Sequence, residues 1–153
     1  MPETPAFELG TDGPTAILVG IDDTVTASRA ASYAAGLARR QGARLITVFV
    51  SPTTTLGAAT PAAATVIVAE NEAHEAIARE LRERVERSSA EWGIDAAFIV
   101  AYGDAYHEIK RVADETRADA IVVGASAKAG HRLVGSLAVR LVRAGKWPVT
   151  VVP

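Results

Sequence analysis

The feature that most constrains the fold of this chain is a regular alternation of short apolar runs with longer segments of helical periodicity. The runs are AILVGI, RLITVFV, DAAFIVAYG, AIVVG and PVTVV, at residues 16–21, 44–50, 95–103, 120–124 and 148–152. Nearly continuous apolar runs of this length are typical of strands that are covered on both faces. The alternation therefore predicts an α/β fold, in which an open, five-stranded parallel sheet carries helices on both faces.

Helical patterns fill the intervals between the runs. Residues 27–43 repeat alanine at helical spacing, with a stop at Gly42, and residues 66–92 predict a long charged helix that ends at Gly93. One stripe of the long helix is apolar and is expected to pack on the sheet; it consists of Ala73, Ala76, Ile77, Leu81 and Val85.

The connections between these elements also carry predictions. Residues 51–65 contain two prolines and are expected to form an unusually long loop. Asp104 and Ser136 precede the two remaining helical patterns, and each is expected to cap its helix.

Composition limits the class of protein. The 153 residues suit one domain, and a net charge of −2 gives no basic field that would attract nucleic acid or an anionic membrane. The absence of cysteine excludes disulfides, thiolate catalysis and cysteine-ligated zinc. No apolar run is long enough to span a bilayer. We expect a soluble cytoplasmic protein with a flexible tail at residues 1–14 and one domain over residues 15–153.

In an open parallel sheet, ligands bind beyond the carboxyl ends of the strands, where the strand order reverses. The loop GASAKAGHRLVGS, at residues 124–136, follows the fourth run and combines glycines with Lys128, His131 and Arg132. It leads into a predicted helix, and amides at a helix N-terminus attract phosphate. This loop is therefore the first candidate for an anion site.

That loop, together with ILVGIDDT near the start and PVTVV at the end, resembles the universal stress protein family of the single-domain UspA type. The resemblance covers residues 16–153 and implies a Rossmann-like sheet of strand order 3-2-1-4-5. It also implies a homodimer through the C-terminal strand, and an adenine nucleotide, ATP with Mg²⁺, at the carboxyl edge of strands one and four.

Nucleotide-binding members of the family carry the pattern G-x2-G-x9-G-(S/T) in this loop, and the chain meets it in part. Ala127 stands at the second glycine, and seven residues rather than nine precede the closing Gly-Ser pair. The Cβ of Ala127 would crowd a phosphate, whereas Gly130 can supply a compensating turn. By resemblance, the nucleotide contacts in this loop are Gly124, Ala127, Gly130, Gly135, Ser136 and Leu137.

Three more positions are implied by the resemblance. Asp22 matches an acidic residue near ribose or metal, Val50 matches a position that contacts adenine, and Thr24 stands for the usual serine. Asp23 departs from the commoner glycine, and two adjacent carboxylates repel a triphosphate unless Mg²⁺ lies between them.

Several of these proposed binding residues also have a purely structural interpretation. The loop can be a simple strand-to-helix turn capped by Ser136, and Asp22 can be a cap or turn former. His74 and His107 are expected to be solvated surface residues, and no catalytic or metal-ligating residue is predicted.

Two functions stay open. The first is a stress-response regulatory domain that binds an adenine nucleotide. The second is a nucleotide-independent dimeric interaction module, with a degenerate phosphate loop and an unidentified protein partner. Enzymatic activity is the weaker reading, at most slow ATP hydrolysis, because the sequence has neither a Walker phosphate loop nor a nucleophile elbow.

Overall fold

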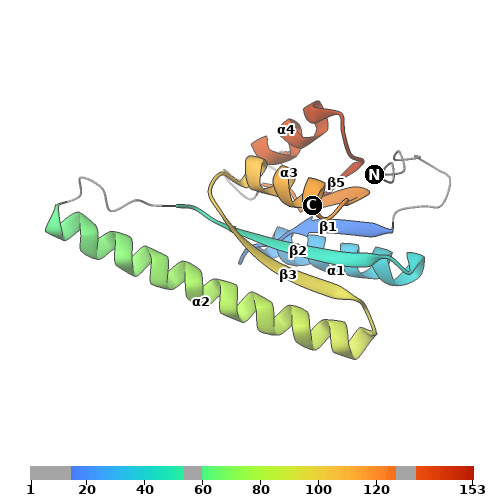
Figure 1. Cartoon of the computed structure of the whole chain (residues 1–153), viewed down its shortest axis with the longest axis horizontal. Helices are drawn as coiled ribbons and strands as arrows, with labels where there is room; N and C mark the ends of the chain where they lie inside the picture. The colour runs from blue at the N-terminus through green and yellow to red at the C-terminus, as the bar shows by residue number, and fades with distance from the viewer. Residues whose placement is uncertain (1–14, 54–59, 127–133) are drawn as a thin grey trace, which may run out of the picture.

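The computed structural model describes residues 15–53, 60–126 and 134–153 (Figure 1). The predicted tail at residues 1–14 lies outside these residues. The described residues form one sheet with helices on both sides, which confirms the α/β class.

The sheet has five parallel strands in the order β3-β2-β1-β4-β5. This confirms the strand order implied by the family resemblance. The strands are β1 (Ala16–Gly20), β2 (Arg44–Ser51), β3 (Ala96–Tyr102), β4 (Ala120–Gly124) and β5 (Val149–Val152). All five apolar runs became strands, with ends that differ from the predicted ones by at most a residue or two.

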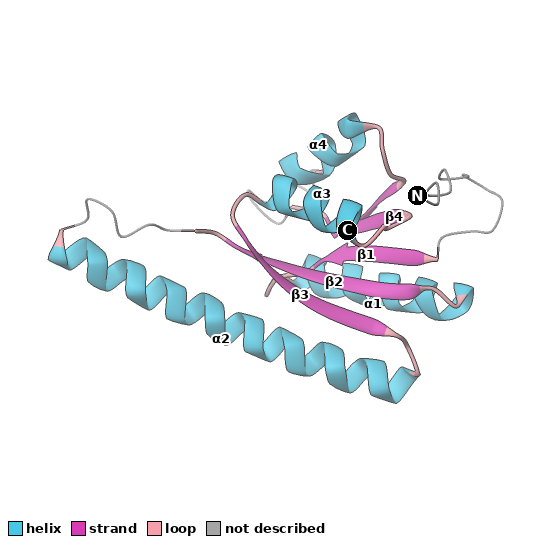
Figure 2. Cartoon of the chain, viewed as in Figure 1, coloured by secondary structure: helices cyan, strands magenta, loops and turns pink. Residues whose placement is uncertain are grey.

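Two helices cover each face of the sheet, as Figure 2 shows. The helices are α1 (Val25–Gln41), α2 (Pro61–Trp92), α3 (Ala105–Glu115) and α4 (Ser136–Ala144). Successive strand residues direct their side chains to opposite faces of the sheet. Ile17, Val19 and Leu45 belong to the core under α1 and α2. Leu18, Ile46 and Val48 join the core under α3 and α4.

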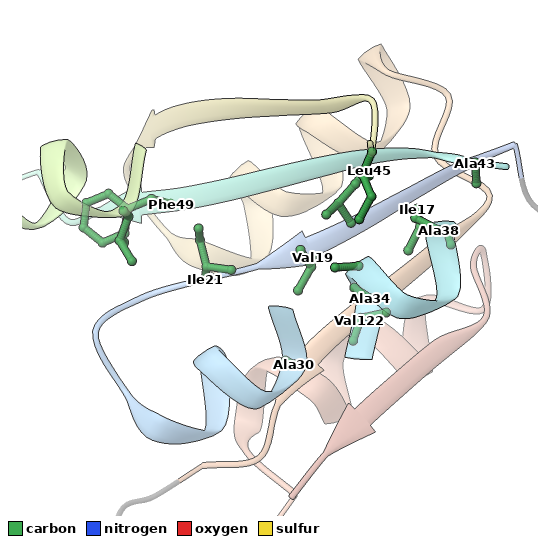
Figure 3. Packing of buried hydrophobic residues seen from close by; sticks show 13 residues of the cluster. Ile17, Val19, Ile21, Ala30, Ala34, Ala38, Ala43, Leu45, Phe49 and Val122 are labelled. Carbon is green, nitrogen blue, oxygen red and sulfur yellow. The ribbon is translucent and has the colours of Figure 1, made fainter. Parts of the chain in front are cut away.

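The alanine face of α1 lets this helix lie close to the strands. Ala30, Ala34 and Ala38 are fully buried, and Figure 3 shows Ala34 beside Val19 and Val122 and Ala38 beside Ile17. Because an alanine Cβ is short, the helix backbone approaches the sheet closely, and packing against larger strand residues fills the space.

Helix α2 begins earlier than predicted. Residues 61–65 are helical rather than loop, since Thr60 caps the helix and Pro61 occupies its first turn, where a missing N–H costs nothing. The N-terminal half of α2 projects past the carboxyl edge of the sheet (Figure 1). Ala73 and Ala76 are exposed, so the predicted stripe is wrong at these two positions; Leu81 is buried as expected.

The two predicted caps have different outcomes. Asp104 caps α3 as expected, and its carboxylate accepts a hydrogen bond of 3.0 Å from the amide of His107. Ser136 is not the cap of α4: Gly135 occupies that position, and Ser136 is the first helical residue. Both residue types are compatible with a helix start, so their order could not be decided from the sequence.

Candidate functional site

The topology brings the loops after β1 and β4 to one place. These strands pair in register, Ile17 with Ala120 and Val19 with Val122. Since they are parallel, their carboxyl ends meet at the same edge, and the strand order reverses there. Four predicted site residues lie at this point, two on each loop: Asp22 and Thr24, Gly124 and Gly135.

After β1, Asp22 and Thr24 form the start of α1. One carboxylate oxygen of Asp22, Oδ1, accepts hydrogen bonds from the amide and the hydroxyl of Thr24. The Thr24 hydroxyl in turn accepts from the amide of Ala27, which makes Thr24 the N-cap. The structural reading of Asp22 as a turn former is therefore correct, and its side chain is fixed and exposed at the switch point.

At the end of β4, Gly124 is required by packing. A Cβ added there would lie 2.6 Å from the carbonyl carbon of Thr26 and 2.8 Å from the nitrogen of Ala27. No side chain fits between β4 and the first turn of α1. The glycine is thus explained by close contact of two backbones, whether or not a nucleotide binds.

Before α4, Gly135 lies against the other end of the same connection. A Cβ added to Gly135 would stand 2.9 Å from the Cβ of Ser126. Ser136 is exposed and Leu137 is half-buried under the α3 and α4 face. The N-cap of α4 is Gly135, which has no side chain and so makes no side-chain cap hydrogen bond to the first-turn amides.

The remaining predicted contacts fall into two groups. Ala127 and Gly130 lie outside the described residues. Val50 is half-buried near the end of β2, and it packs with the core under α3 and α4.

An aromatic and ionic cluster ties α4 to α3 beside this site. The Arg140 guanidinium lies 4.1 Å above the ring of Tyr106 and 3.6 Å from the Asp104 carboxylate. The hydrogen bond from the His107 amide, with a further contribution from Arg140, lowers the pKa of Asp104 below its ordinary value of 3.8. The cap of α3 is therefore an anion at neutral pH.

Two cavities lie on the face covered by α1 and α2. The smaller, of about 110 Å³, lies between the two helices over Leu45 and Thr47, with Asp22 at its margin. The larger, of about 420 Å³, lies where α2 passes the carboxyl ends of β2 and β3. Its polar lining includes His74, Arg79 and Arg82, none of which was predicted as a site residue.

The sequence held a weak signal for the larger cavity. Asn71, His74, Ala78 and Arg82 recur at helical spacing, so they share one face of α2. His74 was expected to be solvated, but its Nδ1 is buried and has no hydrogen-bond partner among the described residues. His107 is exposed at the surface, as expected.

Neither a metal cluster nor a membrane span is found in the described parts of the chain. No group of three or more histidine, aspartate or glutamate side chains within residues 15–53, 60–126 and 134–153 could hold a metal ion. Across the same residues, no helix is long and apolar enough to cross a bilayer.

Solved structures of other proteins share this fold. UspA from Lactobacillus plantarum is 26% identical, with a TM-score of 0.73, over 91% of this chain and 97% of that chain. A universal stress protein in complex with cAMP is 24% identical, with a TM-score of 0.65, over 92% and 97% of the two chains. An Arabidopsis thaliana universal stress protein family protein with AMP bound is 18% identical, with a TM-score of 0.64, over 91% of each chain.

The family to which the chain belongs is shown by a comparison of its sequence with family models. Comparison with curated proteins gave no match. The model of the universal stress protein family matches residues 15–153, from the start of β1 to the end of the chain, and so includes all five strands and both loops at the switch point. The chain belongs to the universal stress protein family.

Proposed function

We propose that this protein is a stress-response regulatory domain that binds an adenine nucleotide at the carboxyl edge of β1 and β4. One observation carries the proposal: the exposed Asp22 carboxylate and the start of α4, whose N-cap is a glycine, lie on neighbouring loops at the switch point of the sheet. Relatives of the same fold, with AMP or cAMP bound, support an adenine nucleotide as the ligand.

The proposed contacts divide between the two loops. Among the described residues, Asp22 accepts hydrogen bonds only at Oδ1, and Oδ2 is proposed to accept one from a ribose hydroxyl. The amides of Ser136 and Leu137, at the start of α4, are proposed to bind phosphate, together with Gly124 and Gly135. Val50 is proposed to contact the adenine, and Mg²⁺ would accompany the phosphates of ATP.

We propose that the nucleotide regulates by binding rather than by turnover. A ligand that binds one conformation preferentially raises the population of that conformation. Phosphate at the start of α4 would stabilise this helix, which Arg140 connects to α3 through Tyr106 and Asp104. The acidic, cysteine-free sequence is compatible with the cytoplasm, where we propose that the protein acts.

Calorimetry on nucleotide-stripped protein tests the site, with Mg-ATP, AMP and cAMP as ligands. Ser136→Glu is the diagnostic variant, because a carboxylate there is favourable for the dipole of α4 but repels phosphate. Ser136→Gln is the matched neutral control. We expect saturable binding that Ser136→Glu abolishes and Ser136→Gln retains. Absence of binding at millimolar ligand to the folded wild-type protein would refute the proposal.

A second candidate function has a specific observation in its favour. Gly124 and Gly135 are both explained by packing against Thr26 and Ser126, so a glycine pattern can persist without a nucleotide. The alternative is a nucleotide-independent module that dimerises through the open edge of β5 and binds a protein partner. An unpaired strand edge is a ready surface for such pairing.

A further inference from the structure

The larger cavity on the α1 and α2 face has the properties of a ligand site of its own. Its volume of about 420 Å³ falls within the range of about 300–1,000 Å³ that is usual for small-molecule sites. Its lining residues come from α2 and from the carboxyl ends of β2 and β3, and Figure 1 shows α2 running past these strand ends. Asp22, Gly124, Gly135 and Ser136 do not line it, so it is distinct from the proposed nucleotide site.

The sheet side of this cleft combines apolar side chains with the hydroxyl groups of Ser51 and Tyr102 at the strand ends. Phe49 of β2 and Val100 of β3 face it, and both belong to the core under α1 and α2. Ala78 of α2 adds a short side chain opposite them. Val50, the proposed adenine contact, packs on the other face of the sheet. The apolar part of the cleft suits a ring or a short hydrocarbon group.

The helix side of the cleft carries positive charge. Arg79 and Arg82 both line it, together with a single acidic side chain, Glu75. None of these three forms an ion pair with any residue in the described ranges. The guanidinium carbon of Arg82 lies 4.8 Å from the centre of the Phe98 ring, so a cation–π contact holds this side chain beside the sheet. A planar guanidinium recognises carboxylate and phosphate groups.

A second, independent observation concerns His74. This residue lines the cleft, and its Nδ1 is buried with no hydrogen-bond partner in the described part of the chain. Buried polar atoms are almost always satisfied, so the Nδ1 of His74 calls for a partner that the described residues do not provide. A ligand or its bound water would supply that partner.

We propose that this cleft binds a small organic anion, with its apolar body on Phe49 and Val100 and its carboxylate or phosphate on Arg79 and Arg82. Phe49 and Val100 offer an organic anion apolar contacts that inorganic phosphate cannot make, and the two arginines offer it charge contacts that a neutral ring cannot make. Phenyl phosphate and phenylacetate are therefore the probes, and they distinguish the two anionic groups.

Calorimetric titration of the full chain with each probe tests this site. We expect saturable binding of at least one probe, while inorganic phosphate and benzyl alcohol, which each carry half of the required chemistry, bind at least tenfold more weakly. Loss of one charge-assisted hydrogen bond corresponds to about tenfold in affinity or more. Arg79→Gln and Arg82→Gln should each weaken binding by that factor.

Two control variants separate this inference from the proposed nucleotide site. Arg87→Gln removes an exposed charge from α2 outside the cleft and should leave probe binding unchanged. Ser136→Glu, which should abolish nucleotide binding, should also leave it unchanged. The inference is overturned if neither probe saturates, if the arginine variants bind as the wild type does, or if Ser136→Glu removes probe binding.

Discussion

At the scale of single residues, the glycines of the switch point serve the fold directly. Gly124 allows the end of β4 to contact the backbone of α1 at Thr26 and Ala27. A family pattern in the sequence marks this position as a nucleotide contact, but the structure gives it a second role that a sequence pattern cannot reveal. Contacts between residues a hundred positions apart become visible only once the chain is folded.

Gly124→Ala is expected to destabilise the protein by about 1–3 kcal/mol, the usual cost of overpacking. The added Cβ meets backbone atoms at 2.6 Å, and backbone cannot move aside as a flexible side chain can. Urea unfolding monitored by circular dichroism measures the change in the free energy of unfolding.

Gly36→Ala is the matched control. This glycine lies inside α1, and its added Cβ would meet only the mobile guanidinium of Arg40 at 3.1 Å. Alanine in a helix interior is favoured over glycine by about 0.5–1 kcal/mol, so this variant should be more stable than the wild type. Equal effects of the two substitutions would contradict the packing role of Gly124.

At the scale of helices and strands, hydrophobic periodicity predicted most elements of the fold, but it did not predict which side chains line the cleft. All five strands were predicted because buried parallel strands are apolar throughout, and the stops of α1 and α2 at Gly42 and Gly93 hold in the structure. The apolar stripe of α2 failed at Ala73 and Ala76, because helical spacing cannot show where the sheet beneath a helix ends. The N-terminal half of α2 projects past the edge of the sheet, and the larger cavity lies there. The sequence therefore did not predict this cavity either.

The start of α3 gives a pH-dependent prediction. The Asp104 carboxylate, which faces the His107 ring and Arg140, has a pKa below 3.8 in the folded protein. A carboxyl group with a lowered pKa contributes stability above its unfolded-state pKa, and this contribution is lost as the pH falls through the folded-state value.

Asp104→Asn is the matched variant, because its amide oxygen can still cap the helix without a charge. We expect the wild type to be more stable than Asp104→Asn at neutral pH, and the difference to shrink as the pH is lowered through 3.8 and below. Urea unfolding of both proteins along this pH series provides the measurement. A difference that stays constant with pH would show that the charge of Asp104 is not involved.

At the scale of the whole molecule, the free edge of β5 decides how copies of the chain could associate. The amides of Ile121, in β4, and Ala125, directly after it, donate to the carbonyls of Pro148 and Val152. In a parallel strand, successive residues direct their backbone N–H and C=O groups to opposite sides. The backbone of Thr150 therefore also faces β4, whereas the backbone groups of Val149 and Val151 face outward. Pairing between copies would therefore use the backbone of Val149 and Val151.

Val151→Pro is expected to convert the proposed homodimer to a monomer, because it removes an outward amide and leaves the bonds to β4 in place. Val151→Ala keeps this amide and should stay dimeric. Light scattering gives the mass of each. A dimeric Val151→Pro variant would remove the β5 edge from the interface. Thr150→Pro is unsuitable for this test, because it would break the chain's own sheet.

The central claim is that an adenine nucleotide binds where β1 and β4 meet, and a chemical-shift map tests it most directly. AMP is titrated into ¹⁵N-labelled protein, and the backbone amide signals are followed. We expect saturable shifts at Thr24, Ser136 and Leu137, with the amides of Arg79 and Tyr102 unmoved. Shifts confined to Arg79 and Tyr102, or no shifts at all in the folded protein, would contradict it.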